Sequence, residues 1–341
     1  MTHDSVDERD LALINAIQVA PRASWAQLGK TLGVDPATVA RRWEQLSATG
    51  LAWVTCVAGP ALHSEFCMAY VDVECRPGRL DEVATALSAE PQIRYVHHLT
   101  GQYDLLIVIA LRKPADLSAY LRGTVTRIPG VRSCRAEMRT AGYTEASRWR
   151  LRSLERSQQH ALQTAGTEPA PAGNLRVDVV DRNLYRLLHE DGRMAFRQLA
   201  QRTGTSEPTA RRRTKRLLTA QLLRLRCEVA QSITGWPITA VIRAHVPPQH
   251  LDSTARSVSA LPDVRLCCGL TGQRNLLLMV WLRTLDDLPR FEATISERFG
   301  HLTIVDRAMC LHTVKQMGRL LDGNGRSIGH VAPNTEVIVG P

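Results

Sequence analysis

The stretch Thr100-Gly101-Gln102-Tyr103-Asp104-Leu105-Leu106-Ile107 returns later in the chain as Thr271-Gly272-Gln273-Arg274-Asn275-Leu276-Leu277-Leu278. The interval from Gly101 to Gly272 is 171 residues, and the same interval brings Asp10 onto Asp181. No insertion or deletion is needed between these points, which indicates a tandem duplication of one unit. Two copies are too few for a solenoid, so the sequence predicts a pseudo-symmetric pair of repeats.

Composition limits the class of protein. A chain of 341 residues with 44% hydrophobic residues is long enough for two to four folded domains. The net charge of +10 favours a polyanionic partner. The apolar runs are about strand length and the first ten residues are charged, so we expect no membrane span, no secretory signal and a cytoplasmic protein. The eight cysteines form no C-x-x-C pair, and no motif indicates a metal or a cofactor.

Each repeat begins with a helical part. In the first repeat the apolar spacing predicts helices over residues 10–20 and 25–32, the second ending at Gly33. A third helix begins after Asp35, which can cap it, with Pro36 at its first position. Residues 180–222 repeat this pattern. Two helices joined by a short glycine turn are typical of a helix-turn-helix.

The third helix is the candidate nucleic-acid contact. In the second repeat five of the six positions 211–216 are Arg or Lys. A run of charges is often only a solvated helix face, but on this helix it favours contact with base edges and phosphates. The predicted contacts are Asp35, Thr38, Arg41 and Arg42 in the first repeat, and Ser206, Thr209, Arg211, Arg212, Arg213, Lys215 and Arg216 in the second.

After the helices the apolar period changes to two, and each repeat reads βαββαβ. The predicted elements are residues 67–74, 79–88, 93–99, 104–111, 115–127 and 131–139, then 238–246, 250–260, 264–270, 275–282, 285–299 and 303–311. This order is typical of a ferredoxin-like antiparallel sheet with both helices on one face. We expect the two sheets to cover each other's open faces. Residues 144–161 are charged and compatible with a helix, residues 164–173 read as a flexible linker, and the tail from Asp322 is expected to be irregular.

The combination resembles the Lrp/AsnC (feast/famine) family of prokaryotic transcription regulators. The matching positions are Asp7, Asp10, Arg22, Leu28, Gly33, Thr38, Arg42, Leu46, Gly50 and 100–104, with Asp178, Asp181, 191–193, Leu199, Gly204, Ser206, Thr209, Arg213 and Leu217 in the second repeat. The resemblance implies a DNA-binding regulator whose second half, the RAM domain, makes dimer contacts and binds amino acids or related small molecules. Members carry one copy and dimerise, so this chain resembles a tethered pseudo-dimer that would assemble into homo-oligomers.

The predicted fold class is α+β, with two winged-helix/helix-turn-helix domains and two ferredoxin-like βαββαβ (RAM) domains arranged as an intramolecular pseudo-dimer. The expected boundaries are 7–56 and 63–143 for the first repeat, 144–176 for the linker, 177–227 and 236–315 for the second repeat, and 316–341 for the tail.

The resemblance also implies effector loops at the repeated motif. The candidate effector residues are Thr100, Gly101, Gln102, Tyr103, Asp104, Thr271, Gly272, Gln273 and Asn275. Gly101 lets the backbone approach a ligand and Asp104 can receive an ammonium group. The alternative is a hairpin turn whose aspartate satisfies local N–H groups. Because Arg274 and Asn275 replace Tyr103 and Asp104, we expect two unequal pockets.

His97 and His98 raise an enzymatic alternative. The predicted architecture also resembles that of siroheme decarboxylases, which use histidines near a tetrapyrrole pocket. The motif after His98 matches the regulator instead, so the sequence predicts no catalytic residues and a protein that is not an enzyme. A third possibility is an interaction protein whose helical part no longer binds DNA, which the cationic third helix argues against.

Overall fold

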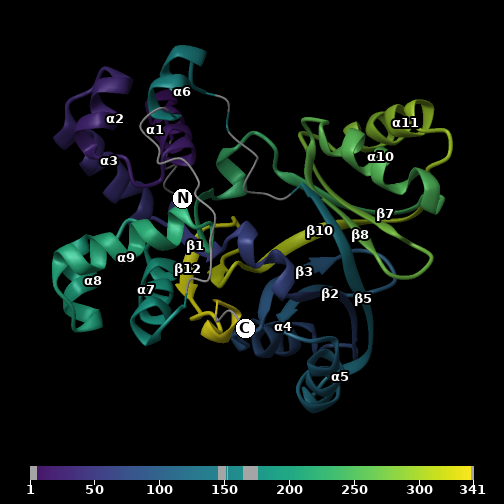
Figure 1. The fold of residues 1–341 in the computed structure, drawn as a ribbon. Helices are drawn as coiled ribbons and strands as arrows, with labels where there is room; N and C mark the ends of the chain where they lie inside the picture. The colour runs from purple at the N-terminus through teal and green to yellow at the C-terminus, as the bar shows by residue number, and fades with distance from the viewer. Residues whose placement is uncertain (1–5, 145–150, 152, 164–175, 339–341) are drawn as a thin grey trace. The chain divides into compact units, whose positions relative to one another are not determined.

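The computed structural model describes residues 6–144, 151, 153–163 and 176–338. The chain divides into two units, and each unit takes segments from both repeats (Figure 1). We call residues 1–66, 150–230 and 326–341 the helical unit, and residues 67–149 and 231–325 the barrel unit. Among the described residues, no helix is long and apolar enough to cross a membrane.

The helical unit contains the two predicted three-helix groups. They are α1 (Glu8–Val19), α2 (Trp25–Leu32) and α3 (Pro36–Ala48), then α7 (Val179–Glu190), α8 (Phe196–Thr203) and α9 (Glu207–Thr219). Asp7 and Asp178 cap α1 and α7 through reciprocal side-chain to backbone bonds, which start these helices earlier than apolar spacing alone predicts. Gly33 and Gly204 both adopt φ +67°, the left-handed conformation that ends α2 and α8.

Two strands of the helical unit were not predicted. Strands β1 (Ala52–Ala58) and β6 (Leu223–Val229) follow α3 and α9 and pair antiparallel across the repeats. Thr55 lies opposite Arg226, its equivalent in the second repeat, so the local two-fold passes between them. Strand β1 is nearly continuous in apolar residues and so lacks the alternation that marks a half-exposed strand. Strand β6 does alternate apolar and charged residues and was missed despite that signal.

The expectation of an irregular tail is wrong. Residues after Asp322 form β12 (Ser327–His330) and the 3-10 turn η5 (Thr335–Ile338). Ile338 is 1% exposed within the core of the second three-helix group, and His330 Nε2 lies 2.6 Å from Nδ1 of buried His189. Buried apolar and polar contacts therefore order a segment whose composition alone suggests disorder.

The segment between the repeats is helical over part of its described residues. Helix α6 spans Arg156–Gln163, whereas residues 145–150 and 152 of the predicted helix 144–161, and the predicted linker 164–173, lie outside the described residues. Asn15 Oδ1 accepts hydrogen bonds from the N–H groups of Ser153 (2.9 Å) and Leu154 (3.1 Å), and Gln18 Oε1 accepts one from Leu151 (3.1 Å). Two buried polar side chains of α1 therefore hold this segment on the first three-helix group.

The barrel unit contains the two predicted βαββαβ units. The first consists of β2 (Cys67–Cys75), α4 (Leu80–Ala89), β3 (Ile93–Leu99), β4 (Leu105–Leu111), α5 (Pro114–Gly123) and β5 (Val131–Thr144). The second consists of β7 (Ile238–His245), α10 (Pro248–Ser259), β8 (Val264–Leu270), β9 (Leu276–Leu282), α11 (Asp287–Arg298) and β10 (Thr303–Gln316). The strand orders β3-β4-β2-β5 and β8-β9-β7-β10 are those of a ferredoxin-like sheet.

The two sheets close into one ring. Strand β5 pairs with β8 of the other repeat, and β10 pairs with β3. Both last strands are longer than predicted because their ends, to Thr144 and Gln316, extend along the other repeat's edge. A short strand, β11 (Arg319–Leu321), folds back on β10. Because the ring is closed, the edge strands β3, β5, β8 and β10 each pair with a neighbouring strand on both sides.

Three apolar clusters fill the barrel unit. One lies between the first sheet and α4 and α5, and one between the second sheet and α10 and α11 (Figure 1). The third is shared by the two sheets and includes Tyr70, Leu106 and Val108 with Val241, Cys268 and Leu277. The prediction that the sheets cover each other's second face is confirmed, and this contact is what makes the chain an intramolecular pseudo-dimer.

Candidate functional site

The third helix of the first repeat presents few free charges. Asp35 Oδ1 accepts hydrogen bonds from the N–H groups of Ala37 (2.9 Å) and Thr38 (3.3 Å), so its carboxylate is occupied as a helix cap. Thr38 is half-buried and Arg41 is exposed. Of the four residues predicted in this helix, Arg41 alone presents an unengaged cationic side chain.

Arg42 is held inside its own domain. Its guanidinium lies 3.0 Å from Asp7 and 2.8 Å from Asp10, the two residues of the α1 capping box. Burial by itself raises the pKa of Asp7, but the Asp10 N–H and the Arg42 guanidinium bring that pKa below its usual value. The Asp-x-x-Asp motif and Arg42 therefore fix the orientation of α3 on α1.

The second repeat builds the same contact with one more arginine. Arg213 lies 2.7 Å from Asp178 and 3.1 Å from Asp181, and Arg216 lies 2.6 Å from Asp181. The Asp181 side chain is fully buried, so these arginines compensate its charge. Arg42, Arg213 and Arg216, predicted as DNA contacts, are thus engaged in ion pairs between helices.

The exposed cations of α9 are Arg211, Arg212 and Lys215. Arg211 lies 2.9 Å from Glu207, one turn earlier on the same helix. Ser206 caps α9 by accepting a hydrogen bond from the Thr209 N–H (3.4 Å). The predicted residues therefore lie on one helix, and its outer face carries three cations where the first repeat carries Arg41.

An arginine clasp between the two three-helix groups was not predicted. Arg22 donates to the carbonyls of Gly192 (2.7 Å) and Met194 (2.9 Å), and Arg193 donates to those of Pro21 (2.7 Å) and Ala23 (2.9 Å). Each guanidinium also covers an aromatic ring, Arg22 over Phe196 and Arg193 over Trp25. All these residues obey the 171-residue offset, which is the sequence signal that could have revealed the contact.

In the barrel unit, the two predicted effector loops are tied across the repeats. Thr100 Oγ1 accepts from the Met309 N–H (2.9 Å), and its own N–H donates to the Met309 carbonyl (2.9 Å). Thr271 makes the same two bonds with Met138, at 2.9 and 2.8 Å. Gly101 and Gly272 adopt φ +98° and +93°, which only glycine tolerates without strain. Each loop therefore lies at the junction between the repeats.

Asp104 is engaged within its own repeat. Its Oδ2 accepts a hydrogen bond from the Cys75 N–H at 2.7 Å, and Asn275 makes the equivalent bond to Val246 at 2.9 Å. Both bonds join the loop to a residue 29 positions earlier in the chain, so each side chain satisfies a backbone N–H that is near in space and distant in sequence. Gln102, Thr271 and Gln273 are exposed and Tyr103 is half-buried, so these residues are accessible to a ligand.

The second loop carries Arg274 into a buried cluster. Its guanidinium lies 3.2 Å from Glu137 and 3.4 Å from Asp72. Arg243 bonds both carboxylates, at 2.6 Å for Glu137. Burial raises the pKa of Asp72 although both arginines oppose the shift. Asp72, Glu137 and Arg243 were missed. For Asp72 and Arg243 a charge inside a largely apolar strand is a visible signal, whereas Glu137 lies in a strand with several arginines and gives none.

His97 is buried where β3 meets β10. Its Nδ1 lies 3.0 Å from Thr313 Oγ1 and 3.8 Å from Cys310 Sγ. Burial lowers the pKa of His97 to about 4, so the ring is neutral at physiological pH. Within the described part of the chain its Nε2 has no hydrogen-bond partner.

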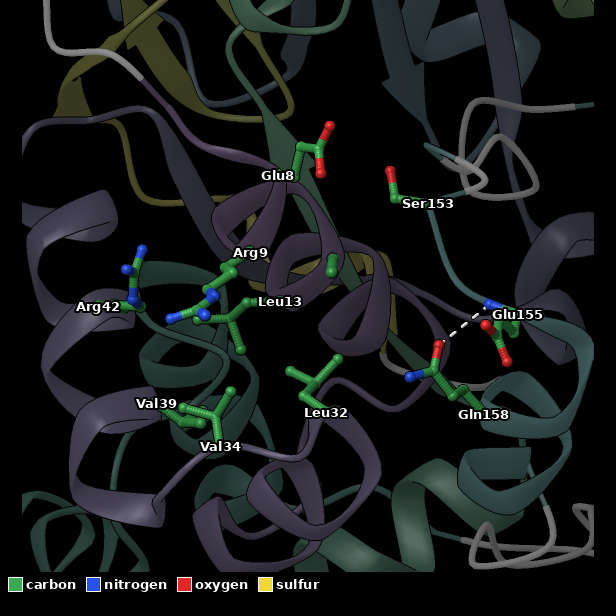
Figure 2. A pocket seen from close by; sticks show the side chains of 11 residues that line it. Glu8, Arg9, Leu13, Leu32, Val34, Val39, Arg42, Ser153, Glu155 and Gln158 are labelled. Atoms are coloured by element: carbon green, nitrogen blue, oxygen red, sulfur yellow. Dashed lines mark hydrogen bonds between the residues drawn. The ribbon is translucent and has the colours of Figure 1, made fainter.

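A pocket of about 270 Å³ lies beside α1 and α3 (Figure 2). Leu13, Leu32 and Val39 give it apolar walls, while Glu155 and Gln158 of the inter-repeat segment line another side. The Glu155 N–H donates to Gln158 Oε1 at 3.0 Å.

Among the described residues, no group of three or more His, Cys, Asp or Glu side chains is placed to hold a metal ion.

The two-repeat fold also occurs in an enzyme. The solved structure of siroheme decarboxylase NirDL in co-complex with an iron-uroporphyrin III analogue covers 91% of this chain and 93% of its own, with a TM-score of 0.62 and 15% identity. A second structure of the same enzyme covers 95% of both chains with a TM-score of 0.59. The prediction that the chain is not an enzyme is therefore wrong, because a protein with the same two-repeat fold is an enzyme and the fold does not exclude enzymatic activity.

Relatives by sequence are regulators. An HTH-type transcriptional regulator of Pyrococcus abyssi (strain GE5 / Orsay) is 29% identical over 123 residues, 36% of this chain and 78% of its own length. The leucine-responsive regulatory protein of Rhizobium meliloti (strain 1021) is 26% identical over 147 residues, 42% of this chain and 92% of its own. Each relative therefore corresponds in length to about one repeat.

Family models match both parts of both repeats. The AsnC-type helix-turn-helix domain matches residues 6–47 and 177–218, and the Lrp/AsnC ligand binding domain matches residues 68–145 and 239–320. Together these matches cover well over half of the chain. The chain belongs to the Lrp/AsnC family, with both parts of that architecture present twice.

Proposed function

We propose that this protein is a sequence-specific DNA-binding transcriptional regulator controlled by a small molecule. The observation that carries the proposal is the pair of capped helix-turn-helix groups, of which the second has a third helix with three exposed cations and the first has Arg41. The first turns of such a helix enter the major groove, and flanking Arg and Lys side chains bind phosphates. A regulator of this kind acts in the cytoplasm, where its DNA is.

The two helix-turn-helix groups would contribute unequally. Arg211, Arg212 and Lys215 supply most of the phosphate affinity, and Arg41 supplies the remainder. Thr38 and Thr209 occupy equivalent positions, but their neighbours differ, so the two helices read different base edges. The operator is therefore asymmetric, and footprinting that returned two identical inverted half-sites would contradict this part of the proposal.

The small molecule, which we infer to be an amino acid or a related compound, would bind at the first loop, residues 100–104. The family model names the barrel domain as ligand binding, and a regulator that is leucine-responsive by name is among the relatives. At the second loop Arg274 is already paired with two carboxylates, so a ligand ammonium group meets a cation there. Further pairing of chains into homo-oligomers would use surfaces outside the barrel junction.

The test is a mobility shift with DNA upstream of the protein's own gene, across a salt series and with a panel of amino acids. Specific binding with a steep salt slope is expected, and the effector is the amino acid that changes the affinity. Arg212→Ala with Lys215→Ala should weaken binding, whereas Arg290→Ala on α11, whose side chain is 79% exposed, is the matched control. Binding that is unaffected by the α9 variants would refute the assignment of this helix.

A second candidate is a tetrapyrrole-modifying enzyme, favoured by the shared fold with siroheme decarboxylase over 91% of the chain. His97, buried at the junction of the repeats, is the residue on which such chemistry would be sought. Absorption spectroscopy separates the two candidates. If the Soret band of siroheme shifts when the protein is added, the enzyme is favoured. If the siroheme spectrum is unchanged and the protein binds specific DNA, the regulator is favoured.

A further inference from the structure

Two oppositely charged residues occupy equivalent positions in the two repeats of the barrel unit. Asp72 on β2 and Arg243 on β7 are related by the 171-residue offset, and they are 2% and 4% exposed. Their side chains bond directly to each other. A pseudo-two-fold axis brings equivalent residues together, so this pair lies where an exact two-fold would place two copies of one residue.

In the rest of the cluster, too, the acidic residue comes from the first repeat and the basic residue from the second. Glu137 from the first repeat lies 2.6 Å from Arg243 and 3.2 Å from Arg274, and Arg274 lies 3.4 Å from Asp72. The positions equivalent to Glu137 and Arg274 are Ala308 and Tyr103, which carry no charge at neutral pH. Arg274 also lies 3.9 Å from Asp306 of its own repeat, whose side chain is 45% exposed. Both buried carboxylates therefore come from the first repeat, and both guanidinium groups come from the second.

We propose that this cluster specifies which repeats pair. A barrel made of two first repeats would bring together two copies of Asp72 and two of Glu137, four buried carboxylates without a buried cation. A barrel made of two second repeats would bring together two copies each of Arg243 and Arg274. Like charges in a buried site cannot all remain ionised without a large penalty. Only the mixed pair is neutral, so each first repeat pairs with a second repeat.

The partner that fits this face is therefore the other repeat, which the same chain supplies at high effective concentration. The apolar contacts between the sheets do not discriminate between pairings in this way, because apolar packing tolerates related side chains. Specificity comes from the charges and adhesion from the apolar cluster. This inference concerns assembly and stands independently of DNA or effector binding.

Two full-length variants test it. The acidic variant carries Arg243→Asp and Arg274→Glu, and the basic variant carries Asp72→Arg and Glu137→Arg. Each has four like charges at its own junction. When the two variants are mixed, the unchanged first repeat of the acidic variant can pair with the unchanged second repeat of the basic variant. The two substituted repeats can then pair with each other, with their charges reversed relative to wild type. Denaturant unfolding and pull-down of a tagged chain are measured for each variant alone, for the mixture, and for each variant mixed with wild type.

We expect each variant alone to unfold at lower denaturant than wild type, and the mixture to recover most of the loss. The tagged acidic variant should capture the basic variant at least ten-fold better than it captures itself. If stability recovers in this mixture and not when either variant is mixed with wild type, the chains pair at the junction and not through another surface. Variants as stable alone as wild type, or a mixture that recovers nothing, would overturn the proposal.

If the double variants do not fold, the exchange Asp72→Arg with Arg243→Asp within one chain provides a milder test. It keeps two positive and two negative charges in the cluster. The two single variants leave three like charges against one, so the exchange should be more stable than either single variant. An exchange no more stable than the single variants would overturn the proposal.

Discussion

Arg22 and Arg193 reach across the helical unit in opposite directions, and each donates two hydrogen bonds to backbone carbonyls that flank the other. The two residues are equivalent in the repeats, as are Phe196 and Trp25, the rings that they cover. Burial lowers the pKa of both guanidinium groups, to about 10 for Arg193. Both remain charged at neutral pH, so the contacts are charge-assisted.

Replacing Arg22 with Ala should therefore destabilise the helical unit. Two charge-assisted hydrogen bonds are lost and two buried carbonyls lose a donor, which predicts a fall of about 2–4 kcal/mol in the free energy of unfolding. Arg193→Ala should give a similar loss because its contacts are equivalent. Denaturant titration measures both, with Arg212→Ala on exposed α9 as the control that should stay near wild type.

The arginines of α9 should separate into two functional groups. Arg212→Ala with Lys215→Ala removes two exposed cations, so the slope of log affinity against log salt should fall by about 2 while stability is unchanged. Arg213→Ala instead removes a partner of the buried Asp181 and should lower the free energy of unfolding by about 1 kcal/mol. An equal effect of both changes on salt slope would contradict this division.

Effector binding should occur once per chain. Calorimetry with the amino acid identified by mobility shift should give one site, and Tyr103→Ala should abolish it, because Tyr103 is the half-buried aromatic side chain of the first loop. Gln273→Ala in the second loop, where the glutamine is exposed, should leave the isotherm unchanged. Two equivalent sites per chain would disprove the inequality of the loops.

Buried His97 should make stability depend on pH. Its pKa is lowered to about 4 in the folded state from 6.5, so the unfolded chain binds a proton first as the pH falls. The free energy of unfolding should therefore decrease between pH 6.5 and 4, by ~3 kcal/mol at 1.36 kcal/mol per pKa unit. His97→Gln should flatten this decrease, measured by denaturant titration at each pH, while His98→Gln should retain it.

The repeat offset and local periodicity predicted most of the secondary structure, including strands Ile93–Leu99 and Val264–Leu270 and helix Trp25–Leu32 without error. Misses occurred where tertiary contacts decide the outcome. Strands β1 and β6 form because each finds the other, and the tail is ordered because Ile338 enters a core built by other segments. Strand β1 and the tail leave no periodic pattern in their own stretches, whereas β6 alternates apolar and charged residues and was missed despite that signal.

The candidate interface divides in the same way. The sequence located the third helices and their charge, because capping residues and Arg/Lys runs are local features. It could not separate Arg211, Arg212 and Lys215 from Arg213 and Arg216, because that depends on Asp178 and Asp181 about 30 residues earlier. Which cations are free for DNA is a property of helix packing.

The sequence by itself determined that this protein is a duplicated helix-turn-helix and βαββαβ chain, because helix caps, apolar periods and the 171-residue repeat are written in local order. Only the tertiary structure decided how the duplicates recognise each other. Asp72 and Arg243 are ordinary strand residues until closure of the barrel buries them together. Two charges leaving water must be compensated by whatever lies opposite, and what lies opposite is fixed by the fold.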